Sequence, residues 1–177
     1  FANMDYVKKY NEYRYWTGHF PQYDNSEMAS FIEKQSPLNN RLRDQWISVL
    51  AHKQLWHLIH KYYQPTNNVA IQCYGAEAYW QYQEFQKAIQ IATPLWLSSH
   101  TQPKACDNIF KHLNQHAQWH NTYWKKRIIL ALDERQLLLA RQLLNHGNPS
   151  DKAAADTLWR IHTQPEYITK IHIGPWH

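Results

Sequence analysis

Apolar residues recur at helical spacing along the chain, and no stretch alternates convincingly between apolar and polar residues as a half-buried strand does. Near the start this spacing is followed by four aromatic residues: Tyr6, Tyr10, Tyr13 and Trp16. Asp24 or Ser26 is then placed to cap a second helix. Proline and asparagine, rather than glycine, separate the helical stretches: Pro37, Pro65, Asn67, Asn68, Pro94, Pro103, Asn148, Pro149 and Pro165. The pattern therefore predicts a succession of short helices.

A faint internal repeat joins these helices in pairs. Each copy has apolar residues at relative positions 0, 5 and 8: Ala51, Trp56 and Ile59, then Trp80, Phe85 and Ala88, then Leu132, Leu137 and Ala140. A short polar connector follows the first member of each copy, as expected where two antiparallel helices turn back on each other. The uneven spacing between copies favours an all-α fold, an irregular α-solenoid or superhelix of short antiparallel helix pairs, with residues 1–177 forming one domain. A compact helical bundle is the alternative.

Composition narrows the fold further. The chain has only 4 glycines among 177 residues, and glycine supplies the positive φ of tight hairpins and phosphate-binding loops. An all-β sandwich and a Rossmann domain are therefore disfavoured. Aromatic residues make up 15% of the chain and can fill a core, which excludes a disordered chain. No apolar run approaches the roughly 20 residues that span a bilayer, so no transmembrane segment is expected.

Charge adds little to this picture. The net charge of +5 and the isoelectric point near 9.1 suggest a negatively charged partner only weakly. Lys125, Lys126 and Arg127 form a basic cluster that continues at Arg135 and Arg141. We interpret this cluster as a solvated helix face, and we expect no specific nucleic-acid binding.

Two cysteines, Cys73 and Cys106, lie 33 residues apart in the sequence. Three hypotheses are open at this point: a disulfide, two buried thiols, or one nucleophile whose pKa is lowered by Lys104. The disulfide is favoured. It would tie one helix pair to the next and would place the chain in an oxidising compartment.

Histidines are frequent, 12 in all, and two sets have helical spacing. His112, His116 and His120 are four residues apart, and His57 and His60 are three apart. On one continuous helix the first set could chelate zinc or copper. Residues 114–121 are, however, polar enough to connect two helices. We therefore expect surface histidines, no metal site and no cofactor.

The carboxylates form no recognisable catalytic motif. The glutamates are Glu12, Glu27, Glu33, Glu77, Glu84, Glu134 and Glu166. Glu77 is followed by Tyr79 and Trp80, and so we expect it to be partly buried, in a structural rather than a catalytic role. The chain contains no Gly-x-Ser-x-Gly motif, glycine-rich phosphate loop or protein-kinase signature. No catalytic residue is assigned, and the ligand-binding residues are unknown at this stage.

The central stretch resembles a known family. The segment LWLSSHTQPKACDNIF at residues 95–110 is similar to the "LWL-S-G-x-S-Q-P-x-A-C-D-x-L-F" segment in the helical superhelix of soluble lytic murein transglycosylases. Upstream, LRDQW at residues 42–46, followed by Leu50, Ala51 and Trp56, resembles the family's "RLR-x-x-W…LA…W" helix pair. IQCY at residues 71–74 matches the segment with its other cysteine. The similarity covers most of the chain.

The resemblance implies a periplasmic, non-catalytic helical module that positions the glycan strand of peptidoglycan or docks cell-wall proteins. In that family a separate lysozyme-like domain cleaves the MurNAc–GlcNAc bond and carries a Glu-Ser dipeptide and a Gly-Leu-Met-Gln segment. Neither motif occurs in residues 1–177, so no catalytic residue is transferred. An independent helical-repeat scaffold for protein partners is the alternative function.

Overall fold

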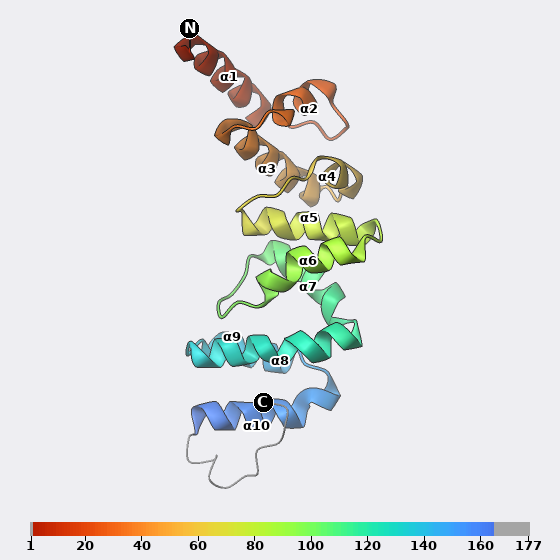
Figure 1. The fold of residues 1–177 in the computed structure, drawn as a ribbon, viewed down its shortest axis with the longest axis vertical. Helices are drawn as coiled ribbons and strands as arrows, with labels where there is room; N and C mark the ends of the chain where they lie inside the picture. The colour runs from red at the N-terminus through yellow and green to blue at the C-terminus, as the bar shows by residue number, and fades with distance from the viewer. Residues whose placement is uncertain (1, 165–177) are drawn as a thin grey trace. The chain divides into compact units, whose positions relative to one another are not determined.

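A computed structural model describes residues 2–164, which form ten α-helices, two short 3-10 helices and no strand (Figure 1). The all-α prediction is confirmed. In chain order the elements are α1 (Ala2–Thr17), α2 (Ser26–Glu33), α3 (Pro37–His52), α4 (Trp56–Tyr62), α5 (Val69–Gln81), α6 (Phe85–Trp96), η1 (Lys104–Cys106), α7 (Asp107–Asn114), α8 (Ala117–Asp133), α9 (Leu137–Asn145), η2 (Pro149–Asp151) and α10 (Lys152–Thr163). Pro165, expected to divide the C-terminal third, lies outside the described residues.

The chain divides into two compact units. The first unit consists of residues 1–92 and 103–110, and the second of residues 93–102 and 111–177. The assignment of residues 1–177 to one domain stays a prediction. No helix within residues 2–164 is both long enough and apolar enough to cross a bilayer.

Three helix pairs turn through the same kind of three-residue connector, at residues 53–55, 82–84 and 134–136. The middle residue of each connector has a positive φ: Gln54 at 57°, Gln83 at 61° and Arg135 at 57°. In the first connector the Leu55 N–H donates to the Leu50 carbonyl and the Gln54 N–H to the Ala51 carbonyl, each over 3.0 Å. The other two connectors repeat both hydrogen bonds. This is the Schellman arrangement, in which glycine usually takes the left-handed position. The internal repeat of the sequence therefore marks these turns, which glutamine and arginine make in place of glycine.

The N-terminus of α2 differs from the expectation. Its N-cap is Asn25, whose Oδ1 accepts hydrogen bonds from the N–H groups of Glu27 at 2.9 Å and Met28 at 3.0 Å. The prediction that Asp24 or Ser26 caps this helix is wrong. Asp24 instead accepts hydrogen bonds from side chains of α4, because the tertiary fold brings a lysine and a tyrosine to it.

The first unit packs α1 to α5 around a core in which Leu42, Trp46 and Ile47 of α3 are fully buried. The indole Nε1 of Trp46 donates to the Pro21 carbonyl over 2.8 Å, and this bond holds the loop before α2 against α3. In the same unit, Cys73 of α5 and Cys106 of η1 are fully buried and form a disulfide. The disulfide favoured from the sequence is thus present, and it ties residues 103–110 back to α5.

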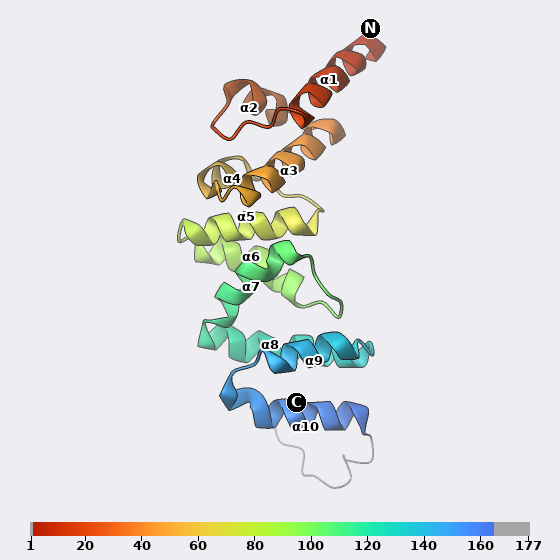
Figure 2. The same cartoon turned by 180° about the vertical axis from the view of Figure 1, so that it is seen from behind.

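In the second unit, α8 packs against both α9 and α10, and the three helices lie side by side in Figure 2. Trp124 of α8 donates its indole Nε1 to the Leu143 carbonyl of α9 over 3.2 Å. Trp96 at the end of α6 packs edge-on against Trp119 of α8, with 5.6 Å between ring centroids. Large aromatic side chains therefore hold the helices of this unit together.

Candidate functional site

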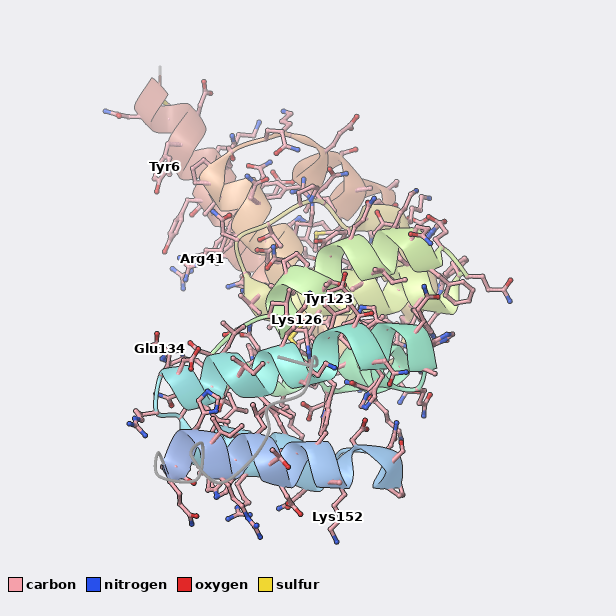
Figure 3. All side chains as sticks on the ribbon, turned by 60° about the horizontal axis from the view of Figure 1, so that its bottom comes forward. Tyr6, Arg41, Tyr123, Lys126, Glu134 and Lys152 are labelled. Atoms are coloured by element: carbon pink, nitrogen blue, oxygen red, sulfur yellow. A yellow bond between two sulfur atoms is a disulfide. The ribbon has the colours of Figure 1, made fainter. Side chains whose placement is uncertain are left out.

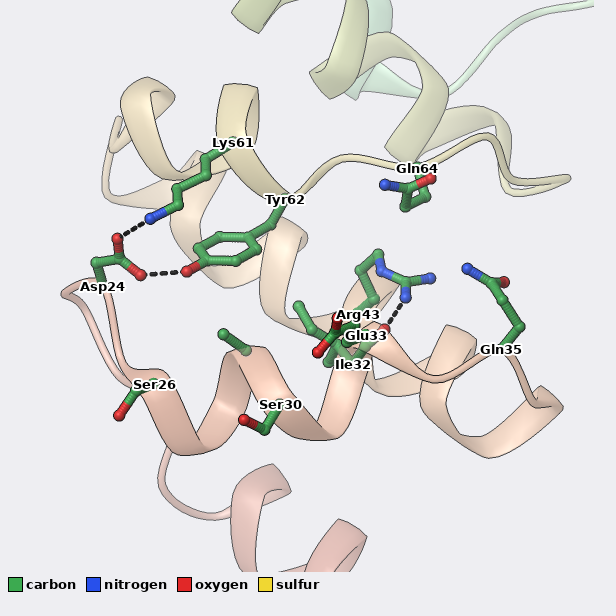
Figure 4. A pocket seen from close by; sticks show the side chains of 11 residues that line it. Asp24, Ser26, Ser30, Ile32, Glu33, Gln35, Arg43, Lys61, Tyr62 and Gln64 are labelled. Carbon is green, nitrogen blue, oxygen red and sulfur yellow. Dashed lines mark hydrogen bonds and ion pairs between the residues drawn. The ribbon is translucent and has the colours of Figure 1, made fainter.

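An open polar groove of about 600 Å³ lies in the first unit, and we call it the α2–α4 groove (Figure 4). Side chains of α2, α4 and the segments next to them line it, together with one side chain of α3. Its charged residues are Asp24, Glu33, Arg43 and Lys61. The neutral ones are two serines, two glutamines, a tyrosine, an alanine and an isoleucine. Hydrogen-bonding groups thus predominate, as suits a polar ligand.

Arg43 is the buried charged residue of this groove, with 4% of its surface exposed. It follows Leu42 and precedes Trp46 by three residues, so it stands beside the apolar stripe of α3 and reaches the end of α2. There its Nη2 donates to the Ile32 carbonyl, and its Nη1 donates to Asn40 Oδ1 over 2.9 Å. None of the ion pairs within residues 2–164 involves Arg43. Burial lowers the pKa of Arg43, while the charge of Asp44 opposes this shift, and a guanidinium remains charged at neutral pH.

The other cation of the groove is already neutralised. The Asp24 carboxylate accepts hydrogen bonds from Lys61 Nζ and from the Tyr62 hydroxyl (Figure 4). The bond from Lys61, followed by that from Tyr62, lowers the pKa of Asp24, and the same contact with Asp24 raises the pKa of Lys61. Arg43 is therefore the cation of the groove that takes part in no salt bridge within residues 2–164, although the charge of Asp44, the next residue of α3, also acts on it.

A second hollow, of about 740 Å³, adjoins the α2–α4 groove, because Asp24 and Ser26 line both. Its aromatic side chains, Tyr15, His19 and Tyr23 among them, come from α1 and the loop that follows. The rings of Tyr15 and His19 stack with 4.4 Å between centroids. We call this hollow the aromatic hollow. It places flat aromatic faces next to polar groups, the combination that binds amphipathic rings.

The predicted histidine sets do not form a metal site in the part of the chain that the structure describes. α7 ends at Asn114 and His116 is the residue before α8, so His112, His116 and His120 do not share one helix. No group of three or more potential His, Cys, Asp or Glu ligands gathers anywhere in residues 2–164.

Two histidines are not the surface residues that the sequence suggested. His120 is 2% exposed, so the prediction of a surface histidine is wrong there. Its two ring nitrogens lie 2.9 Å from Asn114 Oδ1 and 2.8 Å from Asp151 Oδ2, and these partners allow a polar ring to be buried. His60 is half-buried, with Nε2 2.7 Å from Glu84 Oε1, whereas His57 is exposed.

Glu77 is more deeply buried than the sequence indicated. It lies in α5 with 3% of its surface exposed, and Gln81 Nε2 donates to its Oε1 over 2.9 Å. It does not line the α2–α4 groove or the aromatic hollow. Glu166 lies outside the described residues.

The basic cluster of α8 is only partly a solvated face. Lys126 is exposed, and its ammonium lies 5.2 Å from the centre of the Tyr123 ring (Figure 3). Arg127 is instead buried, contrary to the expectation, with its guanidinium 4.6 Å from the Trp96 ring and a 3.1 Å hydrogen bond to the His100 carbonyl. An aromatic face and a carbonyl replace water around this charge. Burial lowers its pKa to about 10.

The α2–α4 groove was not predicted from the sequence. In the sequence, Arg43 is noted only as part of the family-like segment at residues 42–46. A signal was available, because its neighbours at helical spacing, Trp46, Ile47 and Leu50, are all apolar. An arginine among such neighbours is a candidate for burial.

No protein-family profile and no curated protein sequence matches the chain. Solved structures nevertheless share its fold. A 70-kDa soluble lytic transglycosylase in complex with bulgecin A aligns with 99% of this chain at a TM-score of 0.80 and 20% identity. Slt70, the 70-kDa soluble lytic transglycosylase from Escherichia coli, aligns with 95% at a TM-score of 0.76 and 20% identity. The fold is that of part of a soluble lytic transglycosylase.

An inactive variant of the lytic transglycosylase Slt from Pseudomonas aeruginosa aligns with 96% of the chain at a TM-score of 0.74 and 23% identity. The chain spans 28–31% of the length of these soluble lytic transglycosylases. The superhelical all-α fold implied by the segment at residues 95–110 is thus confirmed, although fewer than one residue in four is identical.

Proposed function

We propose that this chain is a periplasmic, non-catalytic helical module of a soluble lytic murein transglycosylase. Its role is to position peptidoglycan for cleavage of the MurNAc–GlcNAc bond by a catalytic domain outside residues 1–177. The observation that carries the proposal is the match in fold over 95–99% of the chain. The similarity of residues 95–110 to a segment of that family supports it.

The first unit supports binding of a glycan that carries peptides. Stacked rings in the aromatic hollow offer a face on which a sugar ring can pack. The adjoining α2–α4 groove offers hydroxyl, amide and guanidinium groups for polar substituents. Because Asp24 and Ser26 line both, one ligand can occupy the two hollows together.

The buried disulfide between Cys73 and Cys106 supports the periplasmic location. Disulfides persist in oxidising compartments such as the periplasm and are rare in the cytosol.

Sedimentation with purified sacculi tests the proposal. We expect the 177-residue chain to pellet with sacculi at physiological salt, whereas a scaffold for protein partners stays in the supernatant. Tyr15→Ala should reduce the pelleted fraction, because it removes a ring of the aromatic hollow. Tyr6→Ala is the matched control, since Tyr6 is a similarly exposed tyrosine of α1 (62% against 54%) outside that hollow. Equal losses in both variants, or no pelleting of the unmodified chain, would contradict the proposal.

A separate assay addresses catalysis. Purified chain is added to a suspension of sacculi and the turbidity is followed. We expect no clearing, because a catalytic domain elsewhere carries out the cleavage in this proposal. Clearing by the chain alone would contradict the non-catalytic role.

A further inference from the structure

We infer that the α2–α4 groove binds a free carboxylate of a short peptide, and that Arg43 is the residue that takes this carboxylate. The choice of a peptide as the carrier rests on the proposed function, since peptidoglycan carries peptides. The preference for a carboxylate rests on the groove itself.

The Arg43 guanidinium has N–H groups left to donate to a ligand. A guanidinium has five N–H donors, and two of them are used, by Ile32 and Asn40. Its charge is buried without an ion-pair partner among residues 2–164. The charge of Asp44 offsets the cost of this burial only in part, since the pKa of Arg43 is still lowered. A carboxylate in the groove can supply a second counter-charge and can accept two of the remaining N–H groups side by side.

The side chains around this guanidinium suit a peptide. Arg43 lies with Gln35 and Gln64 on one side of the groove (Figure 4), and their amides are suited to the N–H and C=O groups of a peptide. Asp24 and Glu33 also line the groove. Together with Lys61 and Arg43 they give the groove no net charge, so the groove has no excess of positive charge to attract a phosphate chain or a nucleic acid. A short acidic peptide fits these groups better than a polyanion does.

The test must separate binding from the structural role of Arg43, because its bond to the Ile32 carbonyl also satisfies the end of α2. Ser30→Glu provides this separation. Ser30 lines the groove and is exposed, so a glutamate at that position adds a negative charge that repels a ligand carboxylate without removing a buried group. Arg43→Gln is the direct variant.

The experiment is an NMR titration of the isotope-labelled chain with N-acetyl-L-Ala-D-Glu, which has two free carboxylates, and with its diamide. We expect the dipeptide to shift amide signals of α2, and the diamide to bind about tenfold more weakly or not at all. Arg43→Gln and Ser30→Glu should each weaken dipeptide binding by about tenfold. Arg41→Gln, an exposed residue of the same helix, removes the same charge and should change the affinity less than about twofold. Thr122→Glu, in the other unit, controls for an added carboxylate.

Four results overturn the inference: no binding of the dipeptide, equal binding of the diamide, equal effects of Arg43→Gln and Arg41→Gln, or no effect of Ser30→Glu. If Arg43→Gln fails to fold, Ser30→Glu still decides the outcome. The sacculus assay is independent of this titration. If the dipeptide binds but the chain does not pellet with sacculi, the proposed function alone is refuted. If the chain and its Ser30→Glu variant both pellet with sacculi but the dipeptide does not bind, this inference alone is refuted.

Discussion

Gly75 of α5 lies directly against the aromatic ring of Tyr63, and a methyl group at this position has no space. A Cβ added to Gly75 would lie 2.5 Å from Cε2 and 2.6 Å from Cδ2 and Cζ of that ring. Carbon atoms in contact are normally separated by about 3.5–4.0 Å, so in Gly75→Ala the ring has to move by roughly 1 Å. Tyr63 is buried and packs edge-on against Tyr79, with 6.1 Å between centroids, which resists that movement.

The net effect is the difference of two opposing free energies. Overpacking a core costs about 1–3 kcal/mol. Alanine in a helix interior is favoured over glycine by about 1 kcal/mol. Because the Tyr63 ring is held in place, we expect the overpacking cost to exceed the helix preference, so that Gly75→Ala lowers the free energy of unfolding by up to about 2 kcal/mol.

Urea unfolding followed by far-ultraviolet circular dichroism measures this effect, and a double-mutant cycle tests its cause. In the Tyr63→Leu background the ring is gone, so Gly75→Ala should become stabilising, by up to about 1 kcal/mol. Gly18→Ala is the control in the unmodified background, because its added Cβ meets nothing closer than 3.7 Å and should not destabilise the chain. If Gly75→Ala stabilises the protein equally with and without the Tyr63 ring, the reasoning is refuted.

The disulfide, the Tyr63 hydroxyl and the first connector, all in the first unit, can each be tested by substitution. Replacing Cys73 and Cys106 together with alanine should lower the free energy of unfolding by about 3–4 kcal/mol, because the disulfide closes a loop with a sequence separation of 33; urea unfolding measures this, and an unchanged midpoint would contradict it. Burial, followed by the charges of neighbouring groups, raises the pKa of Tyr63 to about 12. The unfolded chain ionises this group near pH 10, so its contribution to stability is complete below pH 10 and is lost as the pH rises through 12. At pH 11 the stability lost in this way is about 1.4 kcal/mol. Tyr63→Phe should remove this loss from the pH dependence of urea unfolding, whereas Tyr23→Phe, at an exposed position, should leave it unchanged. Gln54→Gly should stabilise the chain by about 0.5–1 kcal/mol, because glycine adopts the positive φ of this turn without strain; a lower thermal midpoint would count against that explanation.

The candidate site could be predicted from the sequence only in part. The disulfide pair was among the hypotheses, because two cysteines in a chain of short helices have few roles. The α2–α4 groove was not predicted, since its residues come from segments as far apart as Asp24 and Gln64. His120 and Arg127 were expected at the surface, and both are buried. Local spacing cannot show which polar side chain meets a carbonyl or a carboxylate of another helix.

The sequence by itself determined the helical class and the positions of three turns. Helix periodicity and the repeat around Gln54, Gln83 and Arg135 are local properties, set by backbone geometry within a few residues. Tertiary structure alone decided that Asn25 rather than Asp24 caps α2, and that Arg43 is buried at the end of that helix. The physical reason is that burial of a charge depends on partners that distant segments supply, and those partners come together only when the helices pack.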